Sequence, residues 1–306
     1  MSKLTYWLTA YLAMAVYAPV YGAEALAFVT EIKGEAHIAR GDGKEEAADI
    51  GDQLYVGDSL KADKGNAVLI YLSGRSVDVT AGQTHAVQGE QAESSKLLGR
   101  VMNTLVEIAG PLDENKRPVV HGMARNLTGV TGALPANTRI SKMDFLFSWD
   151  AREAVTAYDF TLETAEGEVL ATKTVQGTQL SAADLGLEPG KRYMWEVVET
   201  ESFVPHGSGK SWVEIATKEH TAQLNETFSL IEKNYSGDTA TLFKATNYFR
   251  EGFLFETERS IIALKEKRPL SSIENKLLML SYIKMERWDR LSAPKEKKEE
   301  PVRTEE

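Results

Sequence analysis

Apolar and polar residues alternate along the chain from Phe28 onward, the pattern of a strand with one buried face. The apolar face carries Ile32, Gly34, Ala36 and Ile38. Residues 67–72 are apolar on both faces, and alternation returns over residues 76–81 after a Ser-Gly pair. These segments predict a compact β unit that contains a hairpin.

Two turns are predicted between these strands, where Gly-Asp-x-Leu occurs twice within residues 49–60. Glycine permits tight turns, and aspartate bonds nearby backbone amides. Asp49, Asp52 and Asp58 also suggest a calcium site, but the dense alternating carboxylates and terminal glutamate of a calcium loop are missing. We therefore interpret these aspartates as solvated turn residues.

Helical spacing first appears after the possible caps Ser94 and Ser95. The apolar positions are Leu97, Leu98, Val101, Met102, Leu105 and Ile108. We predict one helix here, closing the first β domain. Residues 111–137 lack periodicity and are rich in turn formers, so they are interpreted as a connection between domains.

A second alternating region is marked by large aromatic residues. They are Phe145, Phe147, Trp149, Tyr158, Phe160, Tyr193 and Trp195. Several short strands in series predict a β-sandwich, and large rings at inward positions fill the space between its two sheets. Trp149 and Trp195 are accordingly predicted to be core residues.

Helical spacing takes over from His220 to the end of the apolar sequence. Tyr248 and Tyr282 are separated by 34 positions, the period of a helix-pair repeat. Three or four helices are expected to pack in antiparallel pairs. Residues 293–306 are a mixture of Lys, Glu, Arg and Pro with few apolar residues, so we expect a disordered tail.

Three resemblances to known families follow from these segments. Gly34, the paired Gly-Asp turns and residues 67–76 resemble the FecR domain of bacterial envelope proteins, which implies a small β fold without enzymatic activity. Residues 141–217 resemble a fibronectin type III module, through Phe-Ser-Trp at 147–149 and Pro-Gly-Lys-Arg-Tyr-Met-Trp at 189–195. Residues around Tyr248 are similar to a tetratricopeptide unit, with departures at Thr257 and Met279.

The N-terminus has the features of a secretory signal peptide. Lys3 precedes a mostly apolar run over residues 4–20, and small residues follow at Gly22, Ala23 and Ala25. We expect cleavage near Ala23 or Leu26. The alternative is a retained membrane anchor, although the run is slightly short for a span and is interrupted by polar residues and a proline.

The net charge and the cysteine content argue against several classes of function. The formal net charge of -10 argues against a phosphate-binding surface, so nucleic acid is not expected as a partner. The chain has no cysteine, which excludes a disulfide framework, a thiolate metal site and a cysteine nucleophile.

No segment carries a recognised catalytic pattern. The five histidines lack the spacing of a metalloprotease motif; they are His37, His85, His121, His206 and His220. Residues 207–211 resemble the end of a phosphate-binding loop, but Val204 replaces its first glycine and a strand is predicted to follow, so a hairpin turn is the better interpretation. Arg40-Gly41-Asp42 is likewise interpreted as a turn instead of an adhesion tripeptide.

The predicted architecture is a multidomain β and α protein. Its parts are a signal peptide (1–25), a FecR-like β domain with a closing helix (26–110), a linker (111–140), a fibronectin type III-like sandwich (141–218), tetratricopeptide-like helices (219–292) and a disordered charged tail (293–306). We expect a non-catalytic periplasmic or cell-surface scaffold without cofactor or metal, whose helices bind an envelope protein in an apolar groove.

Three alternatives stay open at this point. A peptidoglycan or polysaccharide binder would expose Tyr55, Tyr71 or Trp212 on an open surface. A membrane-anchored FecR-type regulator would retain the N-terminal segment and contact the membrane there. An enzyme with an unfamiliar site would need titratable groups that converge in a pocket.

Overall fold

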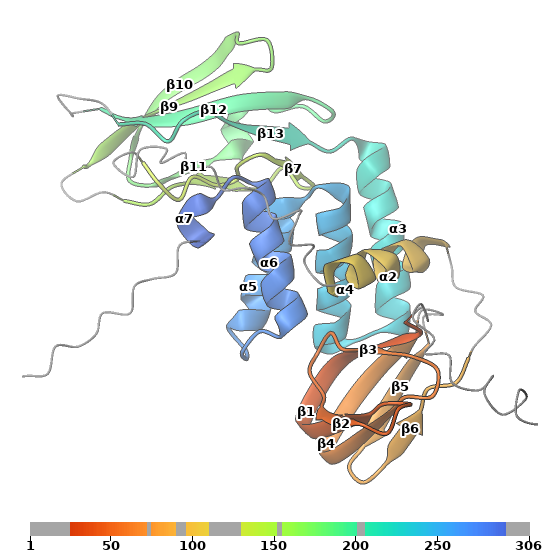
Figure 1. Ribbon diagram of the computed structural model, residues 1–306. Coiled ribbons are helices and arrows are strands. Elements are labelled where there is room, and N and C mark those ends of the chain that lie inside the picture. The colour runs from red at the N-terminus through yellow and green to blue at the C-terminus, as the bar shows by residue number, and fades with distance from the viewer. Residues whose placement is uncertain are drawn as a thin grey trace, which may run out of the picture. The chain divides into compact units, whose positions relative to one another are not determined.

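The computed structural model describes residues 25–71, 75–89, 96–109, 130–151, 155–200 and 206–291. It confirms the mixed β and α fold class: two β regions precede a C-terminal group of packed helices (Figure 1). The chain forms two compact units, one of residues 1–48 and 52–92 and one of residues 49–51 and 93–306. Apart from Ala25, the predicted signal peptide lies outside the described residues, as does the predicted charged tail.

The first unit is a six-stranded antiparallel sheet built around two long strands. Its strands are β1 (Ala27–Ala39), β2 (Glu45–Ala47), β3 (Gln53–Leu54), β4 (Ser59–Tyr71), β5 (Ser76–Thr80) and β6 (Thr84–Ala86). Strands β1 and β4 pair along their length, and Gly34 lies opposite Gly65 in the register. A Cβ atom at Gly34 would stand 2.1 Å from the carbonyl oxygen of Lys64, so the close approach of the two backbones at this point requires glycine.

Asp58 corrects the interpretation of the Gly-Asp turns. Asp58 is only 4% exposed and is therefore not solvated. Its carboxylate accepts hydrogen bonds from the backbone amides of Gly41 (2.9 Å) and Tyr55 (3.1 Å) and pairs with Arg40 at 2.9 Å. Asp58 therefore ties two turns together, and the half-buried Arg40 of the Arg-Gly-Asp tripeptide is held by this ion pair.

The second β region consists of a five-stranded and a two-stranded sheet that face each other across an aromatic core. The larger sheet has the order β10 (Val169–Gln176), β9 (Ala157–Thr164), β12 (Arg192–Glu199), β13 (Ser211–Ile215), β7 (Thr138–Ile140); the smaller pairs β8 (Leu146–Ser148) with β11 (Gln179–Ser181). The Phe147 ring lies 5.0 Å from Phe160 and 4.8 Å from Trp195. Trp149 and Trp195 are 4% and 1% exposed, which confirms their predicted place in the core.

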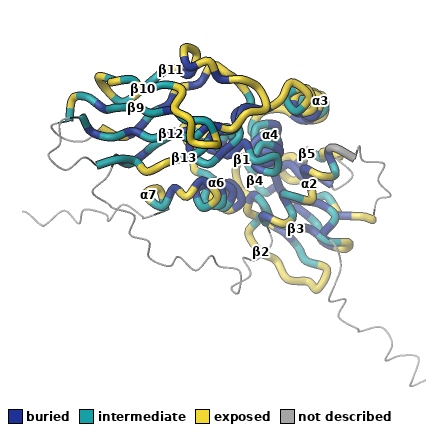
Figure 2. Tube along the Cα trace, turned by 90° about the horizontal axis from the view of Figure 1, so that it is seen from above, coloured by how far each residue is buried: buried dark blue, intermediate teal, exposed yellow. Residues whose placement is uncertain are grey.

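This second region begins earlier than predicted. Residues 130–140 were assigned to the linker, yet β7 pairs in parallel with β13, and Val130 belongs to the aromatic core. The described part of the predicted linker is therefore a structural part of the β region. Buried and half-buried residues alternate along the central strands β9 and β12 (Figure 2), whereas the edge strand β10 begins with the exposed residues Val169 and Leu170.

The C-terminal helices pack as antiparallel neighbours, as their spacing predicted. They are α3 (Lys218–Asn234), α4 (Gly237–Glu251), α5 (Leu254–Lys265), α6 (Ser272–Lys284) and the short α7 (Trp288–Leu291). In the described part of the chain, no helix is long and apolar enough to cross a membrane.

The predicted helix after the first β unit exists as α2 (Lys96–Ala109), but its predicted place is wrong. It belongs to the second unit, where it packs against α3, α4 and α6 (Figure 1). An amphipathic pattern specifies that one face is buried and leaves open which surface buries it.

Candidate helix-binding face

Helix α2 covers a surface formed by α3, α4 and α6, which we call the helix-binding face. Leu98, Val101, Met102, Leu105 and Ile108 of α2 are all at most 7% exposed. Arg100, Asn103 and Glu107 are exposed on the opposite side of the helix. The apolar residues recur at intervals of three and four, so they form one continuous stripe along α2. This is the geometry of an amphipathic helix whose apolar side packs against α3, α4 and α6.

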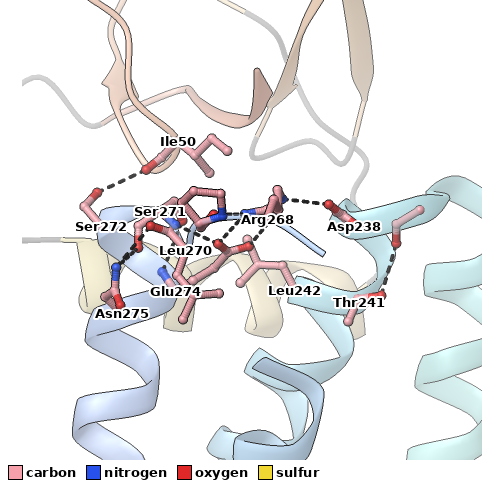
Figure 3. A network of polar contacts seen from close by, with 12 residues as sticks. Ile50, Asp238, Thr241, Leu242, Arg268, Leu270, Ser271, Ser272, Glu274 and Asn275 are labelled. Carbon is pink, nitrogen blue, oxygen red and sulfur yellow. Dashed lines mark hydrogen bonds and ion pairs between the residues drawn. The ribbon is translucent and has the colours of Figure 1, made fainter. Parts of the chain in front are cut away.

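The helices beneath α2 are held in place by Arg268, which precedes α6 (Figure 3). Its Nε donates to Asp238 in the first turn of α4 at 2.8 Å, and its Nη1 and Nη2 donate to the two oxygens of Glu274 at 2.9 and 2.7 Å. Glu274 is 1% exposed and also closes a capping box with Ser271 at the start of α6. The arginine thus links the N-terminal ends of α4 and α6.

Helix α5 packs against α4 through Thr257, the residue that departs from the repeat pattern. The Thr257 side chain is fully buried, and its hydroxyl donates to the backbone carbonyls of Phe253 at 2.9 Å and Ala245 at 3.4 Å. The extra polar atom is therefore satisfied between the two helices, which pack closely without the alanine.

Strand β7 joins the second β region to the helices. The Thr138 hydroxyl accepts from the backbone amides of Leu254 (2.8 Å) and Phe255 (3.3 Å), and so caps α5. Arg139 donates from Nη1 to the carbonyl oxygen of Glu251 (3.1 Å) at the end of α4. Strand β7, more than a hundred residues earlier in the chain, thus supplies hydrogen-bond partners to the end of α4 and the start of α5. It thereby fixes the turn between these two helices.

A cleft of about 390 Å³ opens at this junction. It is lined by Ser141, Lys142, Tyr248, Phe255, Glu256 and Arg259, among others. Oε1 of Glu256 accepts from the backbone amide (2.7 Å) and hydroxyl (2.9 Å) of Ser141, whereas the buried Oε2 has no hydrogen-bond partner in the part of the chain that the structure describes. Burial raises the pKa of Glu256 above its ordinary value.

A second cleft, of about 280 Å³, lies between α2, α3 and α4, and we call it the polar cleft. Its lining includes Arg100, His220, Glu226, Asn247, Arg250 and Glu251. Arg250 donates from Nη2 to Oδ1 of Asn247 at 2.8 Å and pairs with Glu251 at 2.7 Å. His220 pairs with the other oxygen of Glu251 at 3.3 Å. Asn247 Nδ2 and Arg250 Nε, two buried nitrogens of residues that line the cleft, have no hydrogen-bond partner among the described residues.

The aromatic residues that would distinguish a glycan binder do not form an open platform. Tyr71 is 1% exposed, and its hydroxyl is hydrogen-bonded to His85 at 2.8 Å. Trp212 is half-buried, and the Arg192 guanidinium lies 4.3 Å from the centre of its ring. Tyr55 is half-buried and donates to Gln53 at 3.1 Å.

The other residues considered from the sequence do not converge on one site. His37 pairs with Asp63, His85 with Tyr71 and His220 with Glu251, while His121 lies outside the described residues. Gly207 forms a bridge with Val198 beside the β12–β13 pair, and Val204 also lies outside the described residues. Within the described chain, no group of three or more histidine or acidic side chains is placed to hold a metal ion.

An apolar groove on the C-terminal helices is expected from the sequence, but no residue could be assigned to it, and the polar cleft is not predicted. The sequence signal for the face was the unbroken apolar stripe of α2, which was assigned to the wrong domain. Asn247 and Arg250 carried no signal, because single polar residues on a helix are ordinarily solvated.

Comparison with known proteins adds little to this picture. No family model matches the chain, and no curated protein matches it. One similar solved structure is described as a "Cell surface anchoring domain"; it covers 24% of this chain and 97% of its own length at 16% identity, with a TM-score of 0.22. At that TM-score the likeness carries no argument about fold or function.

Proposed function

We propose that this protein is an exported, non-catalytic envelope scaffold that binds an amphipathic helix of a partner protein on the helix-binding face. The packing of α2 supports the proposal, because that face buries five apolar side chains of a helix from a distant part of the chain. The features of a secretory signal in residues 1–25 support a periplasmic or cell-surface location.

The rival functions have less support. The environments of Tyr71 and Trp212 do not favour a glycan-stacking site. A membrane-anchored regulator requires a retained N-terminus, and sequencing the N-terminus of the exported protein decides between the two. A mature start near Leu26 would exclude the anchored form.

The proposed function is tested with a peptide of residues 94–110 that carries a fluorophore, titrated with the full chain in which α2 has been released. Leu105→Glu places a charge in the middle of the buried stripe, so α2 should leave the face. We expect saturable binding of the peptide to this variant, measured by fluorescence anisotropy. A peptide that itself carries Leu105→Glu should not bind.

Two controls make the result interpretable. Asn103→Glu adds the same charge on the exposed side of α2, so this variant should keep α2 docked and bind little peptide. Thr104→Pro interrupts α2 without placing a charge on the face, and should behave like Leu105→Glu. If both released variants keep their circular dichroism and thermal transition but bind no peptide, the face is not a helix-binding site.

A further inference from the structure

Strand β10 forms an open edge of the five-stranded sheet (Figure 1). It is eight residues long and pairs only with β9 among the described strands. At the opposite edge, the backbone amide of Arg139 in β7 already donates to the carbonyl oxygen of Gly252 at 3.0 Å. A long edge strand presents a row of backbone groups to which another extended chain can pair. Strand β10 is therefore the edge at which this sheet can be extended.

The register shows which backbone groups of β10 face outward. The amide of Gly177 donates to the carbonyl of Thr156 at 3.3 Å, so these residues form a hydrogen-bonded pair of the antiparallel ladder. Hydrogen-bonded and non-hydrogen-bonded pairs alternate, which places Thr174 opposite Asp159 in a non-hydrogen-bonded pair. The Thr174 hydroxyl donates to Asp159 at 2.7 Å, as the closer side chains of such a pair allow. The backbone N–H and C=O of Thr174 consequently point away from β9, as do those of Thr172.

Apolar side chains accompany these outward-facing backbone groups. Ala171 and Val175 are half-buried and pack against the aromatic core, and Lys173 lies between them on the same face of the strand. At the start of β10, Val169 and Leu170 are 57% and 46% exposed. An additional strand beside β10 would extend the core face of the sheet and bury apolar surface there.

The charge of Lys173 selects among the strands that can be added. Lys173 forms no ion pair with the described residues. On an edge strand, a charge on the core face and a bulge such as the one between Val169 and Ala171 discourage indiscriminate pairing. A basic residue directly opposite Lys173 would be repelled, whereas a carboxylate would pair with it. The same lysine thus disfavours most strands and favours an acidic one.

We propose that β10 binds an extended segment of a partner protein as an additional antiparallel strand, with a glutamate or aspartate opposite Lys173. Apolar residues two positions to either side of the acidic residue lie opposite Ala171 and Val175. Backbone hydrogen bonds to Thr172 and Thr174 hold the segment in register. The surface uses no residue of the helix-binding face, so the inference does not depend on the proposed function.

The test uses two fluorophore-labelled peptides, Thr-Val-Thr-Glu-Thr-Val-Thr and its counterpart with lysine in place of the glutamate. Each is titrated with the natural full chain and with the full chain carrying Lys173→Glu, and binding is measured by fluorescence anisotropy. Opposite charges stabilise a cross-strand pair and like charges destabilise it, so the glutamate peptide should bind the natural chain about tenfold more tightly than the lysine peptide. The preference should reverse on the Lys173→Glu chain.

A backbone variant tests the mode of binding. Thr174→Pro removes an outward-facing N–H and should abolish binding, while pairing with β9 is retained because this N–H does not face β9. Thr174→Val loses the same hydroxyl contact with Asp159 but keeps the N–H, so it should bind like the natural chain. Circular dichroism and thermal unfolding check that both variants are folded. If Thr174→Pro is unfolded, the charge reversal at Lys173 decides alone.

Three results would overturn the inference. The first is no binding of either peptide, or equal binding of both peptides to both chains. The second is an equal loss of binding in Thr174→Pro and Thr174→Val. The third is a dimer of the natural chain, seen by sedimentation, that Thr174→Pro abolishes, because β10 would then pair with a second copy. None of these results bears on the helix-binding function, which the peptide of residues 94–110 tests separately.

Discussion

The aromatic core of the second β region and the helix-binding face are both buried apolar surfaces, but they are built differently. The core interlocks rings from strands of two sheets, and its central strands β9 and β12 each pair on both sides. Among the described residues the face is covered by one helix, which contributes mainly aliphatic side chains, and two buried donors beside it have no partner there. The core cannot open without unfolding the sheets, whereas the face needs to lose only one helix.

The largest expected effect comes from breaking the aromatic core. Trp195 is 1% exposed, lies edge-on to Phe147 and stacked on Phe160, and donates from its indole nitrogen to the carbonyl of Pro135 at 2.9 Å. Trp195→Ala should lower the free energy of unfolding by about 4 kcal/mol, measured by urea denaturation. Trp212→Ala is the matched control, because that ring is half-buried on the same sheet and should cost far less. Similar losses for both variants would contradict the assigned core.

The next effect concerns the support of the helix-binding face. Arg268→Met leaves Glu274 as an uncompensated buried charge and separates the ends of α4 and α6, so we expect a loss of roughly 3 kcal/mol. When Arg268→Met is combined with Leu105→Glu, which releases α2 from the face, binding of the peptide of residues 94–110 should weaken as well. Arg259→Met removes an exposed arginine from α5 and should change stability little. If Arg268→Met lowers stability but leaves peptide binding intact, the arginine does not shape the face.

The same comparison explains what the sequence could predict. Strict alternation and large rings specified the strands and the core positions of Trp149 and Trp195, because burial inside a β layer depends on local periodicity. Helical spacing specified α2 and the C-terminal helices for the same reason. These elements can be predicted from residues that are close together in the sequence.

Features that depend on contacts between residues far apart in the sequence cannot be predicted from local patterns. Thr138 caps α5 from 116 residues away, so residues 138–140 resembled a linker. Asp58 was interpreted as solvated because its partners Arg40 and Gly41 lie in another turn. The polar cleft lined by Asn247 and Arg250 is formed by α2, α3 and α4, which are far apart in the sequence, so local patterns do not predict it.

The smallest expected effect concerns the junction that connects the two regions. Burial raises the pKa of Glu256, so the folded state binds this proton more tightly than the unfolded state does. Its contribution to stability is therefore fully present below the ordinary value of 4.5 and decreases as the pH rises through the folded pKa. Glu256→Gln keeps the acceptor for Ser141 and removes the charge, so the variant should match the natural chain at low pH and gain under about 1 kcal/mol at pH 7.

Urea denaturation from pH 4 to 8 tests this sign directly, with Glu266→Gln as an exposed control at the C-cap that follows α5. A stability difference that grows with pH for Glu256→Gln and stays flat for Glu266→Gln would fit a carboxyl group buried at the joint between sheet and helices. If Glu256→Gln instead lowered stability at neutral pH, the ionised carboxylate of Glu256 would be holding β7 against α5. In that case the joint is stabilised by charge, and the β region and helices should separate on acidification.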